Sequence, residues 1–213
     1  MTGPVTGPVT GQVTRLAVGP GITLFKALAG DAVLQAALAV LEAAPPRRMM
    51  TPGGKAMSVA MTNCGPLGWV SDRAGYRYQP DDPQTGRPWP AMPVPMAALA
   101  AAAAEAAGFP GFAPEACLVN LYELESRMGA HQDRDERDRA APIVSASFGL
   151  SARFRIGGTS RTGATVSFLL EHGDVLVFGG PARLAYHGVD RVLPGLHPVL
   201  GARRLNLTFR RVT

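Results

Sequence analysis

The C-terminal half of the chain is a succession of short apolar runs separated by turn signals. Many of these runs alternate between apolar and polar residues, and Gly157-Gly158 and Gly179-Gly180 separate some of them. Alternation with a period of two is typical of half-buried β-strands, and glycine pairs are typical of turns. The predicted strands cover residues 117–122, 143–148, 153–156, 165–170, 174–178, 183–186 and 204–210. Seven or eight short strands with tight turns predict a β-sandwich or a jelly roll.

Two helices are predicted in the N-terminal half. Residues 24–43 carry Ala and Leu at helical spacing and end before a pair of prolines. Residues 96–107 have Pro95 near their start and Gly108 just past their end, which is the usual punctuation of a helix. Between the two helices, residues 69–93 are crowded with Gly, Pro, Asp and aromatic residues. This composition predicts a long ordered loop or lid.

The size and composition of the chain bound its domain organisation. Its 213 residues suit one sizeable core, given a prior of ~150 residues per domain. No apolar run approaches the ~18 residues of a membrane-spanning helix, so no membrane partner is expected. Residues 1–14 contain repeated Thr-Gly-Pro-Val units and lack the features of a signal peptide. We therefore expect a flexible tail over residues 1–14, a single domain over residues 15–213, and a cytoplasmic location.

The net charge and the cysteine content indicate which partners and which structural cross-links to expect. The net charge of +5 favours a polyanionic partner, because Lys and Arg gain affinity by neutralising phosphates. The chain has only two lysines and many alanines, so the base composition of the genome is an alternative source of the arginine excess. Cys64 and Cys117 form no C-x-x-C pattern, which argues against a disulfide framework and a thiolate zinc site.

An H-x-D pair, His131 and Asp133, lies among the predicted strands. Residues two apart on an extended chain point to the same side, so both side chains can face one ion. His187 would join them from a separate strand, whereas His172 and His197 are expected in turns. Two imidazoles and one carboxylate leave three positions open on Fe(II) for substrate and dioxygen. A lone H-x-D pair is weak evidence for a metal site, so the interpretation depends on the residues around it.

The strand predicted at residues 204–210 has one polar and one apolar face. The polar face comprises Arg204, Asn206, Thr208 and Arg210. In an ordinary amphipathic strand this face would meet water. Two arginines with an amide between them also suit a small dicarboxylate, because each guanidinium can hold a carboxylate through two hydrogen bonds. Asn120 and Tyr122 share a strand face in the same way.

Further segments match a known family. They are residues 50–54 (MTPGG), 57–65 (MSVAMTNCG), 67–69 (LGW), 82–86 (DPQTG), 142–145 (PIVS) and 186–188 (YHG). With these, the chain from about Met49 to Phe209 resembles the AlkB-type Fe(II)/2-oxoglutarate-dependent dioxygenases that repair alkylated nucleic acid. The resemblance implies an α+β fold with a double-stranded β-helix core (jelly roll, cupin-like) in residues 116–213. It also implies N-terminal helices and a nucleotide-recognition lid in residues 45–93.

Carried over residue by residue, the resemblance implies three groups of site residues. Fe(II) would be bound by His131, Asp133 and His187. The cosubstrate 2-oxoglutarate would be held by Asn120, Leu121, Tyr122, Arg204, Asn206, Thr208 and Arg210. The nucleic acid would meet Trp69, Tyr76, Arg77, Tyr78, Asp135 and Arg161. An indole can stack on a cationic methylated base through a cation–π contribution, and a carboxylate favours the charged base.

The implied activity is oxidative demethylation of bases of the 1-methyladenine and 3-methylcytosine type. The expected substrate is single-stranded or damaged DNA, with RNA as a further candidate, and the expected enzyme is a monomer. Dioxygen and 2-oxoglutarate would be consumed, and succinate and formaldehyde released. Shared iron chemistry leaves modified RNA, a protein side chain or a small metabolite open as substrates. A non-catalytic nucleic-acid-binding module is the less favoured alternative, because a binder needs no open iron site.

Overall fold

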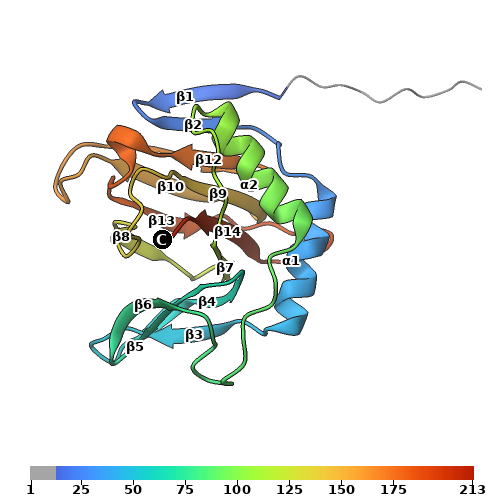
Figure 1. The fold of residues 1–213 in the computed structure, drawn as a ribbon. Coiled ribbons are helices and arrows are strands. Elements are labelled where there is room, and N and C mark those ends of the chain that lie inside the picture. The colour runs from blue at the N-terminus through green and yellow to red at the C-terminus, as the bar shows by residue number, and fades with distance from the viewer. Residues whose placement is uncertain (1–12) are drawn as a thin grey trace, which may run out of the picture.

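The computed structural model describes residues 13–213 of the chain (Figure 1). The tail predicted for residues 1–14 lies outside the described residues, apart from its last two positions. The described strands form a sheet of eight strands, a sheet of four strands and a two-stranded hairpin. Within residues 13–213, no helix has both the length and the hydropathy that crossing a membrane requires.

The large sheet draws its strands from both halves of the chain. Its order is β1-β2-β12-β9-β14-β7-β4-β3, and all neighbours are antiparallel. The bounds are β1 Arg15–Gly19, β2 Ile22–Phe25, β12 Val175–Phe178, β9 Ile143–Gly149, β14 Arg204–Arg210, β7 Ala116–Tyr122, β4 Ala56–Cys64 and β3 Arg47–Met50. Four of these strands precede residue 65, so the sheet extends well beyond the core predicted for residues 116–213.

The small sheet closes the second side of the jelly roll. Its order is β11-β10-β13-β8, with bounds β11 Thr165–Leu170, β10 Ala152–Gly157, β13 His187–Val192 and β8 Met128–His131. Phe154, Ile156 and Val189 of this sheet share one buried cluster with Ile143 and Phe178 of the large sheet. The two sheets therefore face each other across an apolar core, and the predicted double-stranded β-helix is confirmed.

Two helices cover the opposite face of the large sheet (Figure 1). They are α1 (Asp31–Ala43) and α2 (Val94–Ala106), and both pack in one cluster with Leu205, Leu207 and Phe209 of β14. The apolar side chains of β14 thus face the helices, and its polar side chains face the small sheet, because successive residues of a strand point to opposite faces. The predicted helix at residues 96–107 is confirmed within two residues at each end.

The predicted start of the first helix was wrong. Residues 24–43 were expected to be helical, but α1 begins at Asp31, and β2 occupies Ile22–Phe25. All four residues of β2 are buried, and β2 pairs with β1 on one side and β12 on the other. Hydrogen bonding on both edges outweighs a local helical pattern, because tertiary context overrides propensity.

Two further segments differ from the prediction. Residues 183–186 were predicted as a strand, but a 3-10 turn, η1 (Gly180–Ala182), leads into them and β13 begins only at His187. Pro181 lies in this turn, and proline favours the φ of a tight turn over the interior of a strand. Residues 69–93 were predicted as a long loop, but a hairpin of β5 (Gly68–Asp72) and β6 (Gly75–Gln79) takes up their first part.

Cys64 and Cys117 lie opposite each other on β4 and β7. Both are buried and are free thiols.

Candidate active site

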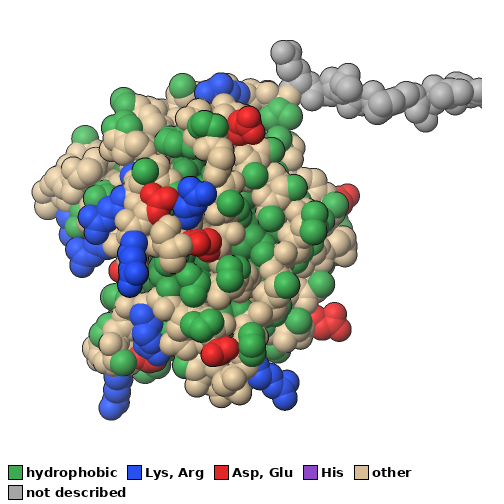
Figure 2. Space-filling view, viewed as in Figure 1, with side chains coloured by type: hydrophobic (Ala, Val, Ile, Leu, Met, Phe, Trp, Pro, Cys, Tyr) green, Lys and Arg blue, Asp and Glu red, His purple; other side chains and the backbone are tan. Residues whose placement is uncertain are grey.

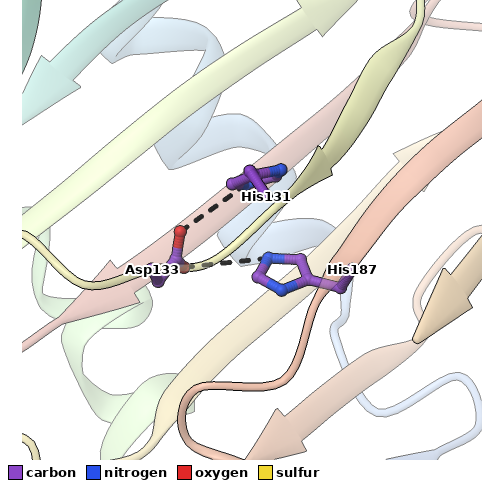
Figure 3. Close-up of side chains that lie close together, drawn as sticks. All are labelled: His131, Asp133 and His187. Atoms are coloured by element: carbon purple, nitrogen blue, oxygen red, sulfur yellow. Dashed lines mark ion pairs between the residues drawn. The ribbon is translucent and has the colours of Figure 1, made fainter. Parts of the chain in front are cut away.

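Three side chains converge between the two sheets (Figure 3). His131 is the last residue of β8, His187 is the first residue of β13, and the pairing of these strands sets the two opposite each other. Asp133 follows β8 by two residues. Its Oδ1 lies 3.6 Å from His131 Nε2, and its Oδ2 lies 4.0 Å from His187 Nε2. One ligand atom of each side chain lies within 4.8 Å of the others, so a single ion can contact all three.

Backbone carbonyls orient both imidazoles. His131 Nδ1 lies 2.9 Å from the carbonyl oxygen of Gly129, and His187 Nδ1 lies 2.9 Å from that of Ala185. A carbonyl can only accept, so each Nδ1 carries the proton and each Nε2 is free to bind a metal. Burial, reinforced by the neighbouring His131, lowers the pKa of His187 to about 4. The His187 ring is therefore neutral near pH 7.

Asp133 provides the negative charge of the cluster. Burial opposes its ionisation, but Arg210 and the two histidines outweigh burial and hold the pKa of Asp133 well below its usual range. Arg210 donates to Asp133 Oδ2 from Nε at 3.1 Å and from Nη2 at 2.9 Å. The cluster therefore offers two imidazole nitrogens and one carboxylate, the donor set that non-haem Fe(II) oxygenases use.

A cavity of about 60 Å³ lies beside this cluster. Of the residues predicted to hold the cosubstrate, its lining includes Asn120, Tyr122, Arg204, Asn206, Thr208 and Arg210. Leu121 does not line it, because its side chain points to the other face of β7 and packs in the core under the helices. The structure thus brings six of the seven predicted side chains together. Burial raises the pKa of Tyr122 to about 12, so its hydroxyl keeps its proton.

Arg204 is a buried cation that has no anionic partner among the described residues. It is 1% exposed, and its Nη2 donates to Ser147 Oγ at 2.8 Å. Within residues 13–213 it forms no ion pair, and its Nε and the nearby Asn120 Oδ1 have no hydrogen-bond partner. Burial lowers the pKa of Arg204 to about 10, which still leaves it charged near pH 7. An uncompensated buried charge is costly, so this cavity fits a ligand that carries a carboxylate.

A larger cavity of about 330 Å³ also borders the cluster. Trp69, Tyr76, Asp135 and Arg161 line it, and so do His131 and Asp133. The rings of Trp69 and Tyr76 stack with centroids 5.5 Å apart and planes 15° apart. Trp69 Nε1 donates to Asp135 Oδ2 at 2.9 Å, which fixes the indole beside the carboxylate. The arrangement presents flat aromatic and acidic surfaces next to the three convergent side chains.

Two predicted substrate residues lie elsewhere. Arg77 is not among the residues that line the larger cavity; its Nη2 lies 2.8 Å from Asp72 Oδ2 within the β5–β6 hairpin. Tyr78 also lies outside the lining, and its hydroxyl donates to Glu136 Oε1. Burial, with Glu136 nearby, raises the pKa of Tyr78 well above its usual value.

Sequence reasoning missed Glu136 and Arg183. Glu136 is 3% exposed and accepts from Tyr78 and from Arg183 Nη2, the latter at 3.0 Å. Arg183 also donates to the main-chain carbonyls of Asp133 and Ala141. It thereby ties the segment after β8 to the turn before β13. Glu136 lies in a mixed run of charges that is typical of a solvated surface, and no local pattern marks either residue.

Comparison with known proteins agrees with this geometry. The sequence profile of the 2OG-Fe(II) oxygenase superfamily matches residues 21–210. The alpha-ketoglutarate-dependent dioxygenase AlkB of Escherichia coli is 52% identical over 172 residues, which cover 81% of this chain and 80% of that protein. The nucleic acid dioxygenase ALKBH1 of Mus musculus is 41% identical over 133 residues, or 62% of this chain and 33% of that protein.

A solved structure extends the likeness to three dimensions. The structure of OsALKBH1 superposes with a TM-score of 0.77 and 28% sequence identity, covering 93% of this chain and all of that one. The superfamily match spans most of the described fold, including the three convergent side chains and β14. The chain belongs to the 2OG-Fe(II) oxygenase superfamily, and within it to the AlkB-type dioxygenases.

Proposed function

We propose that this dioxygenase demethylates alkylated bases in nucleic acid, with Fe(II), 2-oxoglutarate and dioxygen. The proposal rests on one observation: His131 and Asp133 of the three-residue cluster line both the cavity that contains Arg204 and the cavity that contains Trp69. A carboxylate-bearing cosubstrate and a flat cationic base can therefore approach one metal ion from two neighbouring cavities. The nucleic acid named for the mouse relative supports the substrate class.

The proposed metal ligands are His131 Nε2, His187 Nε2 and the carboxylate of Asp133. When bound, iron and 2-oxoglutarate supply the oxidation of an N-methyl group, with succinate, carbon dioxide and formaldehyde as products. The protein holds the ligand set in place through the carbonyls of Gly129 and Ala185 and through Arg210. Arg210 keeps Asp133 anionic, so that the carboxylate competes for metal rather than for a proton.

Arg204 is the proposed partner of the distal carboxylate of 2-oxoglutarate. Arg210 is already paired with Asp133, whereas Arg204 has no anion among the described residues. Asn120, Tyr122, Asn206 and Thr208 supply further donors and acceptors around the same cavity. Leu121 would contribute through its main chain only, because its side chain faces the other way.

The larger cavity is the proposed site of the methylated base. Methylation of a ring nitrogen makes adenine or cytosine cationic, and the face of Trp69 attracts a cation more strongly than a neutral base. Tyr76, Asp135 and Arg161 line the same space. A damaged base pairs poorly, so flipping it out of a duplex costs less free energy, and the cost is lowest when the strand is already single. Arg77 and Tyr78 would act indirectly, by bracing the β5–β6 hairpin against Asp72 and Glu136.

We also propose a domain organisation, an oligomeric state and a cellular location for the enzyme. Residues 15–213 would form a single dioxygenase domain, in which residues 45–93 act as the nucleotide-recognition lid. The enzyme would act as a monomer on single-stranded or damaged DNA, with RNA as a second substrate, and it would work in the cytoplasm. The lid assignment is supported by the position of Trp69 and Tyr76 at the cavity.

Substrate competition tests this function. The wild-type protein is given Fe(II), 2-oxoglutarate and air with methylated single-stranded DNA, methylated RNA or a methylated peptide, and succinate and the repaired product are quantified. We expect product formation coupled to succinate with the nucleic acids only. Coupled oxidation of the peptide alone would overturn the assignment. Asp133→Ala should abolish turnover while leaving the thermal unfolding of the metal-free protein cooperative.

A further inference from the structure

An arginine surface covers the outer face of the small sheet. Phe154 and Ile156 of β10 are buried, so Arg153 and Arg155, which alternate with them along the strand, point to the opposite face, away from the core. On the neighbouring strand β13, Arg191 is exposed and lies directly opposite Arg153 in the register. In the view of Figure 2, basic side chains, with acidic ones among them, are spread along the side of the molecule where Figure 1 places β8 and the β5–β6 hairpin.

The charges on this surface are unevenly balanced. Arg155 Nε lies 3.0 Å from Asp190 Oδ1, so one arginine has a counter-ion. Within residues 13–213, neither Arg153 nor Arg191 makes an ion pair or a side-chain hydrogen bond. Like charges directly opposite on antiparallel strands destabilise a sheet. The pair therefore costs folding free energy, and no described carboxylate offsets that cost.

The surface is continuous with the mouth of the larger cavity. From Arg153, β10 runs to Gly157, a distance of about 13 Å for four strand residues. The connection from β10 to β11 then carries Arg161, which lines the cavity and places its guanidinium carbon 5.8 Å from the ring centre of Tyr186. Basic side chains thus extend from the proposed base site along β10 to the opposed pair.

We propose that Arg153 and Arg191 bind backbone phosphates of the nucleic-acid strand that continues beyond the base in the larger cavity. The inference rests on the proposed function, which makes the ligand a nucleic acid. A phosphate placed between two opposed guanidiniums replaces their repulsion with two charge-assisted contacts, and it releases counter-ions from the strand. Arg161 at the cavity mouth directs the strand onto this surface, so the occupant is single-stranded nucleic acid flanking the methylated base.

Binding measurements on three variants test the surface. Arg153→Gln/Arg191→Gln removes both charges, Arg153→Lys/Arg191→Lys keeps them, and Arg15→Gln removes an exposed charge on β1 at the far edge of the large sheet. Dissociation constants are measured by fluorescence anisotropy over a series of salt concentrations. The ligands are a methylated trinucleotide and a single strand of about twelve nucleotides with the same central base, long enough to follow a charged groove.

Loss of two phosphate contacts has a quantitative signature. For the long strand, the double variant Arg153→Gln/Arg191→Gln should reduce the magnitude of the slope of log K against the logarithm of the salt concentration by about 1.4. Each phosphate contact on a single strand contributes ~0.7 to that slope. Affinity near physiological salt should fall roughly tenfold. The Lys pair and Arg15→Gln should bind the long strand with a slope closer to that of wild type. Trinucleotide binding and demethylation should be unchanged in the Gln pair, and its melting temperature should equal or exceed that of wild type.

Two results would contradict the proposal that Arg153 and Arg191 bind phosphates. In one, the Gln pair binds the long strand with the wild-type salt slope; in the other, Arg15→Gln weakens binding as much as the Gln pair does. Because anisotropy requires no turnover, failure of the proposed function is distinguishable. If the wild-type protein binds the long strand and the double Gln variant does not, but the wild-type protein demethylates no nucleic acid, the proposed function is contradicted. The binding role of Arg153 and Arg191 is then still supported.

Discussion

Three buried arginines around the candidate site differ in the anions available to them. Arg210 pairs with Asp133, Arg183 pairs with Glu136, and Arg204 has no carboxylate partner among the described residues. A buried guanidinium needs a counter-charge to offset its lost hydration. The first two arginines therefore hold the metal-side segments in place, whereas the third is left to meet a ligand.

Loss of Arg204 should separate cosubstrate binding from metal binding. Arg204→Gln removes a charge-assisted contact worth about 1.5–3 kcal/mol, so the dissociation constant of 2-oxoglutarate should rise roughly tenfold to a hundredfold. Isothermal titration of the Mn(II)-loaded protein measures this constant. Affinity for Mn(II) itself should stay within about twofold of wild type, because Arg204 contacts none of the three proposed ligands. Unchanged 2-oxoglutarate affinity would refute the assignment of Arg204.

Arg183 should matter for stability through Glu136. Arg183→Met leaves Glu136 buried without its closest cation, and breaking a buried pair costs about 3–5 kcal/mol of unfolding free energy. Urea denaturation of the metal-free protein measures the loss. The single variant leaves the Glu136 carboxylate with only Arg210 Nε, 3.4 Å away, as a counter-ion. The double variant Arg183→Met/Glu136→Gln should therefore lose less than the single variant, because a neutral amide replaces that carboxylate. Equal losses in both would show that the two side chains are not energetically coupled.

At the scale of elements, sequence predicted the strands whose local pattern agrees with their tertiary pairing. β11 and β14 match their predicted ranges, and the polar face of β14 lines the cosubstrate cavity as its alternation indicated. β2 was missed because its burial comes from two neighbouring strands rather than from its own periodicity. Arg183 and Glu136 were missed for a similar reason, since their pairing joins positions 47 residues apart.

The β5–β6 hairpin should be sensitive to its turn. Gly75 has φ +113, a conformation that disfavours other L-residues, and a Cβ there would meet no other atom. Gly75→Ala should therefore cost about 1–2 kcal/mol of backbone strain and loosen the hairpin. The KM for a methylated oligonucleotide should rise several-fold, with 2-oxoglutarate affinity unchanged. Gly108→Ala is the matched control, because Gly108 has φ +94 in open space beyond α2. Equal effects of both substitutions on KM would contradict the role of the hairpin.

The turn after β11 should make stability depend on pH. His172 Nδ1 accepts from the Gly149 N–H at 3.1 Å, and its ring stacks on His197 with centroids 4.6 Å apart. Burial and His197 lower the pKa of His172, although Asp31 and Asp174 oppose this. His172 therefore takes up a proton more readily in the unfolded chain than in the folded one. Its contribution to the free energy of unfolding is fully present above a pH of about 6.5 and is lost as the pH falls below that value. Chemical denaturation of His172→Asn should show a weaker loss towards about pH 5, and an unchanged pH slope would contradict this account.

At the scale of the whole molecule, the two sheets divide the proposed work. β8 and β13 of the small sheet position His131 and His187, whereas β14 and β7 of the large sheet present the cosubstrate cavity. The β5–β6 hairpin adds Trp69 and Tyr76 from a third direction. Because these parts meet at one cluster, changes in the hairpin or the arginine surface should alter substrate binding without removing the metal ligands.

The most direct test of the central claim couples two products in one reaction. The protein is loaded with Fe(II) and 2-oxoglutarate without oxygen, mixed with a methylated single-stranded oligonucleotide, and exposed to air. Formaldehyde, succinate and the restored base are then quantified together. We predict equal amounts of all three, and none from Asp133→Ala. Succinate formed by the wild-type protein without formaldehyde, while the methylated base persists, would contradict the account.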